Sequence, residues 1–110
     1  MAVFGIDGSQ EHETGTRSNI TLPGVQEQLL ELLAATGTPL VLVLVGGSAM
    51  AVPRWKTRAA ALVLAGYGGE EAGAGLADVL TGLYNPAGRL PYTMHAHPPR
   101  LPRLGVFEKW

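Results

Sequence analysis

The residues best suited to chemistry lie close together near the amino terminus. The segment 7–17 holds three carboxylates, one histidine and one arginine: Asp7, Glu11, Glu13, His12 and Arg17. Glycines flank this segment, and its polar composition predicts a loop from Gly5 to Asn19. Carboxylates on a loop beside a sheet can act as general acids or bases. A solvated acidic turn without function has the same composition, so composition alone leaves both interpretations open.

A second candidate is the glycine-rich turn from Gly66 to Gly75, which lies between an apolar run and a predicted helix. Such turns can bind phosphate through the N–H groups of the helix that follows. The dinucleotide pattern G-x-G-x-x-G fits at Gly66 and Gly68 but meets Glu71 where a glycine is needed. Two glutamates at the helix start would also repel a pyrophosphate. The turn therefore predicts close packing of helix and sheet rather than a nucleotide site.

Metal and nucleophile motifs are incomplete. His12-Glu13 begins like a zinc-protease helix, but the second histidine is replaced by Thr16. His95 and His97 have no obvious third ligand. A nucleophile elbow around Ser48 would need glycine at position 50, where the chain has methionine. We therefore expect neither a metal nor an organic cofactor.

Length and charge limit the possible functions. A chain of 110 residues supports at most one domain. Its net charge of −1 offers no basic surplus for nucleic acid, and cysteine is absent. The longest apolar run, Pro39–Val45, is too short to cross a bilayer. The first residues lack the basic and apolar regions of a signal peptide, and the compartment stays open.

Apolar patterning predicts the elements that must position the acidic loop. Continuous apolar runs predict buried strands at Ala2–Ile6, Leu40–Val45 and Ala59–Ala65. Helices are expected from about Thr21 or Leu22 to Gly37 and from about Glu70 to Thr81, whereas Ala49–Arg58 is too mixed to predict one. This order indicates an α/β fold, a partial three-layer sandwich around a mainly parallel sheet. Glu70 and Glu71 are expected in the first turn of the later helix.

Each helix has an apolar face that is expected to be buried. The two faces consist of Val25, Leu29, Leu32 and Leu33, and of Ala72, Leu76, Val79, Leu80 and Leu83. Two helices on two or three strands make a small core with two open sheet edges. We therefore expect polypeptide outside this chain to complete the core and cover the open sheet edges. The proline-rich residues 95–110 are expected to form an irregular tail.

The acidic loop and its continuation resemble a segment of family 3 glycoside hydrolases, in the branch with β-xylosidases and α-arabinofuranosidases. That segment has the form G-[IL]-D-x-x-x-E-x-E-x-x-D-R-x-x-[IL]-x-L-P-G-x-Q. The residues that match it are Gly5, Ile6, Asp7, Glu11, Glu13, Arg17, Ile20, Leu22, Pro23, Gly24 and Gln26. The chain departs from the form at Thr16, where the family usually has aspartate. A second marker is the phrase Asn85-Pro86-Ala87-Gly88-Arg89-Leu90-Pro91. The resemblance covers about residues 4–94, and it implies that residues 1–94 form a partial α/β domain that follows the family's barrel.

The resemblance implies retaining hydrolysis of terminal β-linked sugars, as in β-xylosidases and β-glucosidases, without metal or organic cofactor. It makes Glu11, and next Glu13, the candidate general acid/base, with Asp7 and Arg17 as substrate-binding residues. The nucleophile would be an aspartate on a (β/α)8 barrel, which needs about 250 residues and would belong to another region of the same or another chain. The alternative is a non-catalytic remnant or an accessory module that binds carbohydrate or a partner.

Overall fold

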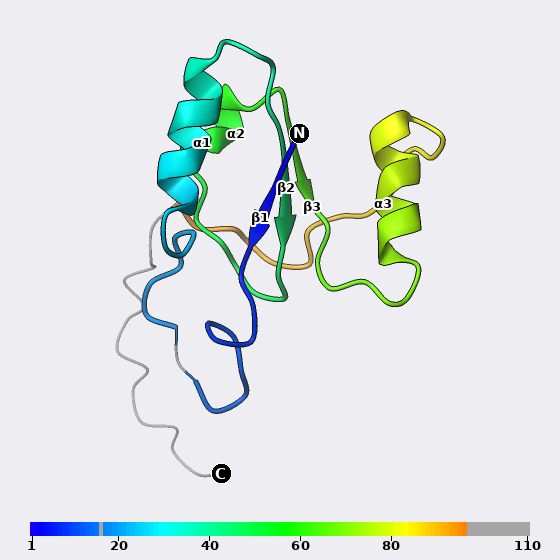
Figure 1. Cartoon of the computed structure of the whole chain (residues 1–110). Coiled ribbons are helices and arrows are strands. Elements are labelled where there is room, and N and C mark those ends of the chain that lie inside the picture. The colour runs from blue at the N-terminus through cyan, green and yellow to red at the C-terminus, as the bar shows by residue number, and fades with distance from the viewer. Residues whose placement is uncertain (16, 97–110) are drawn as a thin grey trace.

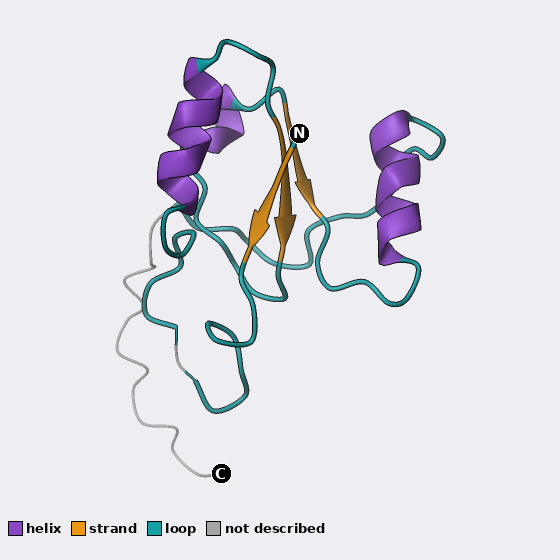
Figure 2. Cartoon of the chain, viewed as in Figure 1, coloured by secondary structure: helices purple, strands orange, loops and turns teal. Residues whose placement is uncertain are grey.

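Three parallel strands form the centre of the structure, a computed structural model that describes residues 1–15 and 17–96 (Figure 1). The elements in chain order are β1 (Ala2–Gly5), α1 (Gln26–Ala35), β2 (Val41–Val45), α2 (Trp55–Arg58), β3 (Ala61–Leu64) and α3 (Ala72–Thr81). β2 lies between β1 and β3, and both pairings are parallel. α1 and α2 lie on one side of the sheet and α3 on the other (Figure 2). The predicted α/β class with a parallel sheet is confirmed.

Part of the sequence-based interpretation lies outside the described residues. This applies to Thr16, to His97 and to positions 97–110 of the proline-rich tail. No helix among the described residues has the length and apolar character to cross a membrane.

The strands lie where the apolar runs predict them, but the predicted burial holds only for β2: no residue of β3 is buried, and Val3 of β1 is 51% exposed, because α3 covers its face of the sheet only partly. Residues 2–5 of β1 pair in register with residues 42–45 of β2, and residues 41–44 of β2 pair with residues 61–64 of β3. The backbones of β1 and β2 come very close at Gly5, where a Cβ atom would lie 1.8 Å from the carbonyl oxygen of Val45. Only glycine is compatible with this approach. Gly5 is the last residue of β1, directly before the acidic loop.

The first helix begins later than predicted, at Gln26 rather than near Thr21. Gly24 has a φ of +60°, in the left-handed region that a right-handed helix cannot include. A turn closed by the Gln26 amide and the Pro23 carbonyl therefore precedes the helix. Gly37, with a φ of +74°, lies just beyond the helix end, as predicted.

The predicted buried face of α1 is wrong for three of its four residues. Val25, Leu29 and Leu32 are exposed, while Leu30 is fully buried and Leu33 and Ala34 pack against the core. The helix carries two apolar sets, because Leu30, Leu33 and Ala34 also follow the i, i+3, i+4 spacing. Polar contacts accompany the observed orientation: Glu27 and Glu31 both bond to the α2 region.

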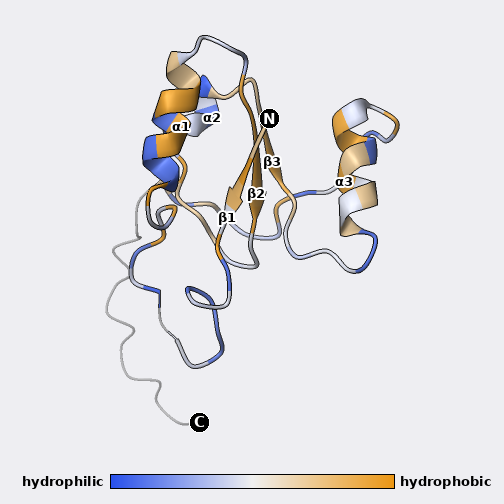
Figure 3. Ribbon diagram, in the orientation of Figure 1, coloured by the Kyte–Doolittle hydropathy of each residue, from blue (hydrophilic) through white to orange (hydrophobic). Residues whose placement is uncertain are grey.

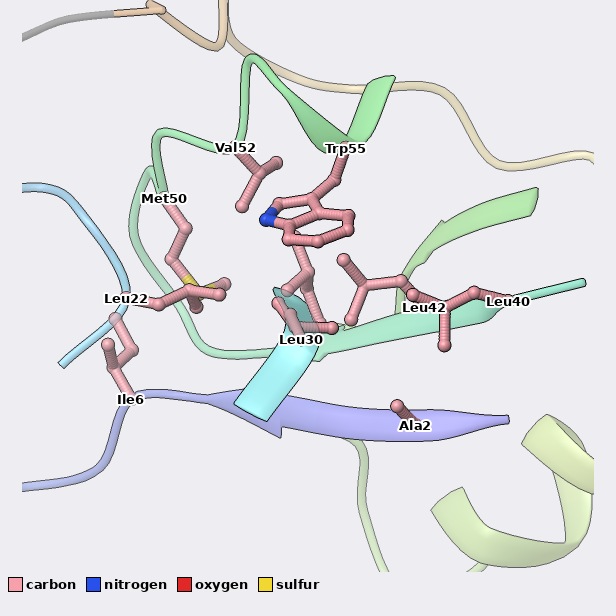
Figure 4. Close-up of a cluster of buried hydrophobic side chains, with 10 residues drawn as sticks. Ala2, Ile6, Leu22, Leu30, Leu40, Leu42, Met50, Val52 and Trp55 are labelled. Atoms are coloured by element: carbon pink, nitrogen blue, oxygen red, sulfur yellow. The ribbon is translucent and has the colours of Figure 1, made fainter. Parts of the chain in front are cut away.

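A single cluster of buried side chains fills the space between the sheet and α1 (Figure 4). Its members are Ala2, Ile6, Leu22, Leu30, Leu40, Leu42, Leu44, Met50, Val52 and Trp55. Trp55 is fully buried, and its Nε1 donates a hydrogen bond of 2.8 Å to Glu27 Oε2. The Arg58 guanidinium lies 4.7 Å from the centre of the indole ring. The burial of Trp55 accounts for the short helix α2, which the sequence did not predict.

The helix on the other side, α3, has no buried residue. Leu76, Val79 and Leu80 of its predicted apolar stripe are half-buried, whereas Ala72 and Leu83 are exposed. The helix begins at Ala72, so Glu70 and Glu71 precede its first turn, contrary to expectation. A cleft of about 510 Å³, lined by side chains of β2, β3 and α3, separates the helix from the sheet. Figure 3 shows that the strands beside this cleft are hydrophobic.

Candidate active site

The acidic loop extends from the carboxyl end of β1, on the same side of the sheet as the ends of β2 and β3 (Figure 1). Ligand sites of parallel sheets lie at this edge. Asp7 shapes the start of the loop, since its Oδ1 accepts hydrogen bonds of 2.8 and 2.7 Å from the amide and the hydroxyl of Ser9. These two bonds, chiefly the one from the hydroxyl, lower the pKa of Asp7 below 3.8. Asp7 is thus an exposed carboxylate fixed in a turn.

Glu11 is attached to the end of β2. Its Oε1 accepts a 3.0 Å hydrogen bond from the Gly47 amide, which is 36 residues away in the chain. The Ser48 hydroxyl makes the largest contribution to lowering the Glu11 pKa below 4.5, and this outweighs the effect of desolvation. Oε2 is shielded from solvent and has no well-formed hydrogen bond among the described residues. Glu11 is therefore a held, ionised carboxylate.

Arg17 reaches the same turn from the other end of the loop. Its Nη1 donates to Ser48 Oγ at 3.3 Å and its Nη2 to the Ala49 carbonyl at 2.9 Å. Its Nε donates to the Asn19 carbonyl at 2.8 Å. The Ser48 hydroxyl accepts from Arg17, so its hydrogen is free to point towards Glu11. The structure thus brings Glu11 and Arg17 together around one serine.

Glu13 differs from Glu11 in that it is exposed and forms no side-chain hydrogen bond with the described residues. It lies in a turn closed by the Gly15 amide and the His12 carbonyl, 3.1 Å apart. The His12 ring packs against Gly15, where a Cβ atom would lie 2.4 Å from it. Glu13 is therefore presented to solvent by a short turn next to the anchored Glu11.

Tyr67 is a site residue that the sequence analysis missed. It follows β3, and its hydroxyl donates a 3.2 Å hydrogen bond to the Ile6 carbonyl at the end of β1. Desolvation contributes most to raising the pKa of its phenol above 10.0, followed by side-chain hydrogen bonding to the Glu11 carboxylate and then by the charges of Glu11 and Asp7. The available signal was its position at the start of the glycine-rich turn, directly after a predicted strand.

The arrangement can supply proton transfer, because an exposed carboxylate and a held carboxylate share one loop above the sheet. It offers little to a metal, since the described residues contain no group of three or more histidine, cysteine or acidic side chains in suitable positions. A polar hollow of about 500 Å³ lies against the loop and is lined in part by Gln10, His12, Arg17 and Asn19. It offers several hydrogen-bonding groups but does not include Glu11 or Glu13.

Comparison with known proteins identifies relatives of the chain at the level of sequence. The chain is 44% identical over 91 residues to the periplasmic beta-glucosidase of Salmonella typhimurium, covering 83% of the chain and 12% of that enzyme. It is 41% identical over 98 residues to beta-D-xylosidase 1 of Arabidopsis thaliana, covering 86% of the chain and 13% of that protein. The exo-1,4-beta-xylosidase bxlB of Emericella nidulans is 44% identical over 93 residues, which are 83% of the chain and 12% of that protein.

The aligned regions thus amount to 12–13% of these relatives. Residues 1–108 match the family profile described as the glycosyl hydrolase family 3 C-terminal domain. With the parallel sheet and the acidic loop at its carboxyl edge, this match confirms the resemblance seen in the sequence: the chain belongs to the C-terminal domain family of the family 3 glycosyl hydrolases.

Proposed function

We propose that this chain supplies the general acid/base of a retaining glycoside hydrolase that acts on terminal β-linked sugars. The observation that carries the proposal is the contrast between two carboxylates on one loop, Glu11 held at the end of β2 and Glu13 exposed beside it. The names of the relatives, β-glucosidases and β-xylosidases, support the same substrate class.

Between the two glutamates, the geometry favours Glu13 as the group that transfers the proton. A general acid must be protonated when the substrate binds, and a raised pKa serves that role. The hydrogen bonds to Glu11 lower its pKa, so this carboxyl stays ionised at neutral pH. The family resemblance placed Glu11 before Glu13, but spacing in the sequence does not distinguish two glutamates that are two residues apart. In our proposal, Glu11 anchors the loop and Glu13 faces the sugar.

The chemistry requires a second carboxylate from another region of polypeptide. In a retaining enzyme the nucleophile lies about 5–5.5 Å from the acid/base and forms a glycosyl-enzyme intermediate. Glu13 would protonate the departing glycosidic oxygen and then, as a carboxylate, take a proton from the attacking water. The resemblance assigns the nucleophile to the barrel domain, which would be the partner of this chain.

Asp7 and Arg17 are the proposed substrate-binding residues. Asp7 uses Oδ1 for Ser9, and its Oδ2 has no hydrogen bond with the described residues, so Oδ2 can accept one from a sugar hydroxyl. The Arg17 guanidinium binds three protein acceptors and retains a second N–H on each Nη atom. Both residues contribute to the shape of the loop, so their replacement should affect substrate binding and loop position together.

Complementation tests this proposal. The 110-residue chain is mixed with the purified barrel domain of a family 3 β-xylosidase, and hydrolysis of aryl β-xylosides and β-glucosides is measured. We expect no turnover by the chain alone and measurable turnover by the mixture. Glu13→Gln should lower kcat of the mixture by about 10²–10⁴-fold. Full activity of the Glu13→Gln mixture, or turnover by the chain alone, would contradict the proposal.

A second candidate is a binding module without catalysis, which the polar hollow lined by His12 and Arg17 favours. This module would bind xylose or xylobiose in the absence of a barrel domain. Calorimetric titration of the chain alone distinguishes the two functions. Saturable binding of xylobiose, together with an inactive mixture, would support the module and exclude the catalytic role.

A further inference from the structure

We propose that Tyr67 is a positioning residue, which fixes the acidic loop by joining the carboxyl ends of all three strands. This inference rests on the proposed function, because the position of the loop matters only if the loop meets a substrate. Tyr67 lies outside the acidic segment that carries the family resemblance. Its hydrogen-bond acceptor, Ile6, is 61 residues away in the chain.

The first contact joins the ends of β3 and β1. The Tyr67 hydroxyl donates to the carbonyl of Ile6, the residue that leads from β1 into the loop. Ile6 is itself well placed, since its side chain is buried and its amide donates a 3.0 Å hydrogen bond to the Val45 carbonyl. The base of the loop is thus held by residues at the ends of both other strands, β2 and β3.

The second contact joins the end of β3 to the turn that follows β2. A Cβ atom on Gly47 would lie 3.1 Å from Cε2 of Tyr67 and 2.7 Å from Oε1 of Glu11. Gly47 is therefore enclosed between the tyrosine ring and the carboxylate that its own amide binds. The ring limits movement of this turn, and through it movement of Glu11, which is two residues from Glu13.

The tyrosine keeps the proton that its hydrogen bond needs, because the ordinary pKa of a phenol already lies well above neutral pH. Desolvation, followed by Glu11 and Asp7, raises the pKa of Tyr67 further. The hydroxyl is therefore a donor at neutral pH, as the contact with the Ile6 carbonyl requires. Tyr67 is nevertheless 57% exposed, so it contributes little to the hydrophobic core. A conservative change should consequently disturb the loop more than global stability.

The chain offers a matched control in Tyr84, which is 60% exposed and whose hydroxyl forms no hydrogen bond with the described residues. The Tyr67→Phe and Tyr84→Phe variants each lose only a hydroxyl group. Tyr67→Ala removes the ring as well, and so separates the hydrogen bond to Ile6 from the packing against Gly47.

Two readouts test the inference. In the chain alone, hydrogen exchange of the Gly47 amide is followed by NMR, and exchange in Tyr67→Phe should be about fivefold faster, as expected for one lost hydrogen bond. In the mixture with the barrel domain, Tyr67→Phe should lower kcat about 10-fold with KM almost unchanged, because misplacement affects the transition state. Tyr67→Ala should exceed both effects, and Tyr84→Phe should match the wild type.

The two readouts separate failure of this inference from failure of the proposed function. Equal Gly47 exchange in Tyr67→Phe, Tyr84→Phe and the wild type would overturn the positioning role. An active mixture in which Tyr67→Phe keeps its kcat would overturn it as well. An inactive wild-type mixture would count against the proposed function, and the exchange measurement would then decide the role of Tyr67 alone. Melting temperatures of the two Phe variants should agree.

Discussion

The two faces of the sheet differ sharply in how well they are covered. On the α1 side, Leu30, Leu42 and Trp55 have no exposed surface, and the cluster around them is continuous. On the α3 side, no helix residue is buried and a cleft of about 510 Å³ remains. Val3 of β1, outside the main cluster, is 51% exposed. One face is a packed core, and the other is only partly covered.

This difference shows which part of the domain is stabilised by contacts within the chain itself. Burial of apolar surface is the main stabilising contribution, and the cluster under α1 provides most of it here. The aligned segment is 12–13% of its relatives, so those proteins have much polypeptide beyond it. We expect α3 to open more readily than α1 and β2, as sparsely packed regions do.

The largest expected effect is in the centre of the packed face. Trp55→Ala should lower the free energy of unfolding by about 3–5 kcal/mol, because it removes a fully buried ring and leaves Glu27 without its indole partner. Urea denaturation followed by circular dichroism measures this loss. A loss below about 1 kcal/mol would show that the cluster is not the main source of stability.

The same substitution on both faces should destabilise the chain to different extents. Leu30→Ala should cost about 2–5 kcal/mol, since Leu30 is fully buried. Leu76→Ala in α3 should cost about 1 kcal/mol or less, because Leu76 is only half-buried. Both values come from urea denaturation under the same conditions. Equal losses would remove the distinction between the two faces.

A steric test addresses the strand pairing that carries the acidic loop. Gly5→Ala should destabilise the chain by about 1–3 kcal/mol, because the added Cβ would meet the Val45 carbonyl oxygen at 1.8 Å. Gly8→Ala is the control, since a Cβ there has no neighbour within 4 Å. Thermal unfolding of the two variants should separate them clearly, and similar melting temperatures would mean that β1 does not approach β2 so closely.

The smallest expected effect is a pH dependence from the anchored carboxylate. The pKa of Glu11 is lower in the folded chain than its usual value of 4.5. Its contribution to stability is therefore present above that value and is lost as the pH falls through the lower, folded-state pKa. Glu11→Gln should be less stable than the wild type at neutral pH and should lose less stability on acidification. Identical slopes of stability against pH for the two proteins would contradict the anchoring role.

The sheet was accessible from sequence because its strands carry apolar side chains on both faces and therefore appear as continuous apolar runs, although β2 alone among them is mostly buried. The buried face of α1 was not accessible, since Val25, Leu29 and Leu32 form an apolar set as regular as that of Leu30, Leu33 and Ala34. The choice between these sets depends on contacts with Trp55 and the strands, which are distant in sequence. The start of α1 was predicted too early for a local reason: Gly24 adopts a positive φ, which a glycine permits but does not require.

The candidate site was predictable in its residue types but not in its geometry. The acidic loop and its match to the family pattern identified Asp7, Glu11, Glu13 and Arg17 as candidates. Their spacing gives no information on Gly47 or Tyr67, whose contacts span 36 and 61 residues. The different environments of Glu11 and Glu13 arise from those long-range contacts, so the sequence could not rank them on physical grounds.

Azide rescue tests directly whether Glu13 transfers the proton, with the Glu13→Gln mixture as enzyme and a dinitrophenyl β-xyloside as substrate. This leaving group departs without an acid, so the glycosyl-enzyme forms but water attacks it slowly without a base. Azide is already an anion and needs no base. We predict that it restores turnover and yields the β-xylosyl azide with Glu13→Gln, but not with Glu11→Gln. No azide product from Glu13→Gln, or the same product from Glu11→Gln, would contradict the assignment of proton transfer to Glu13.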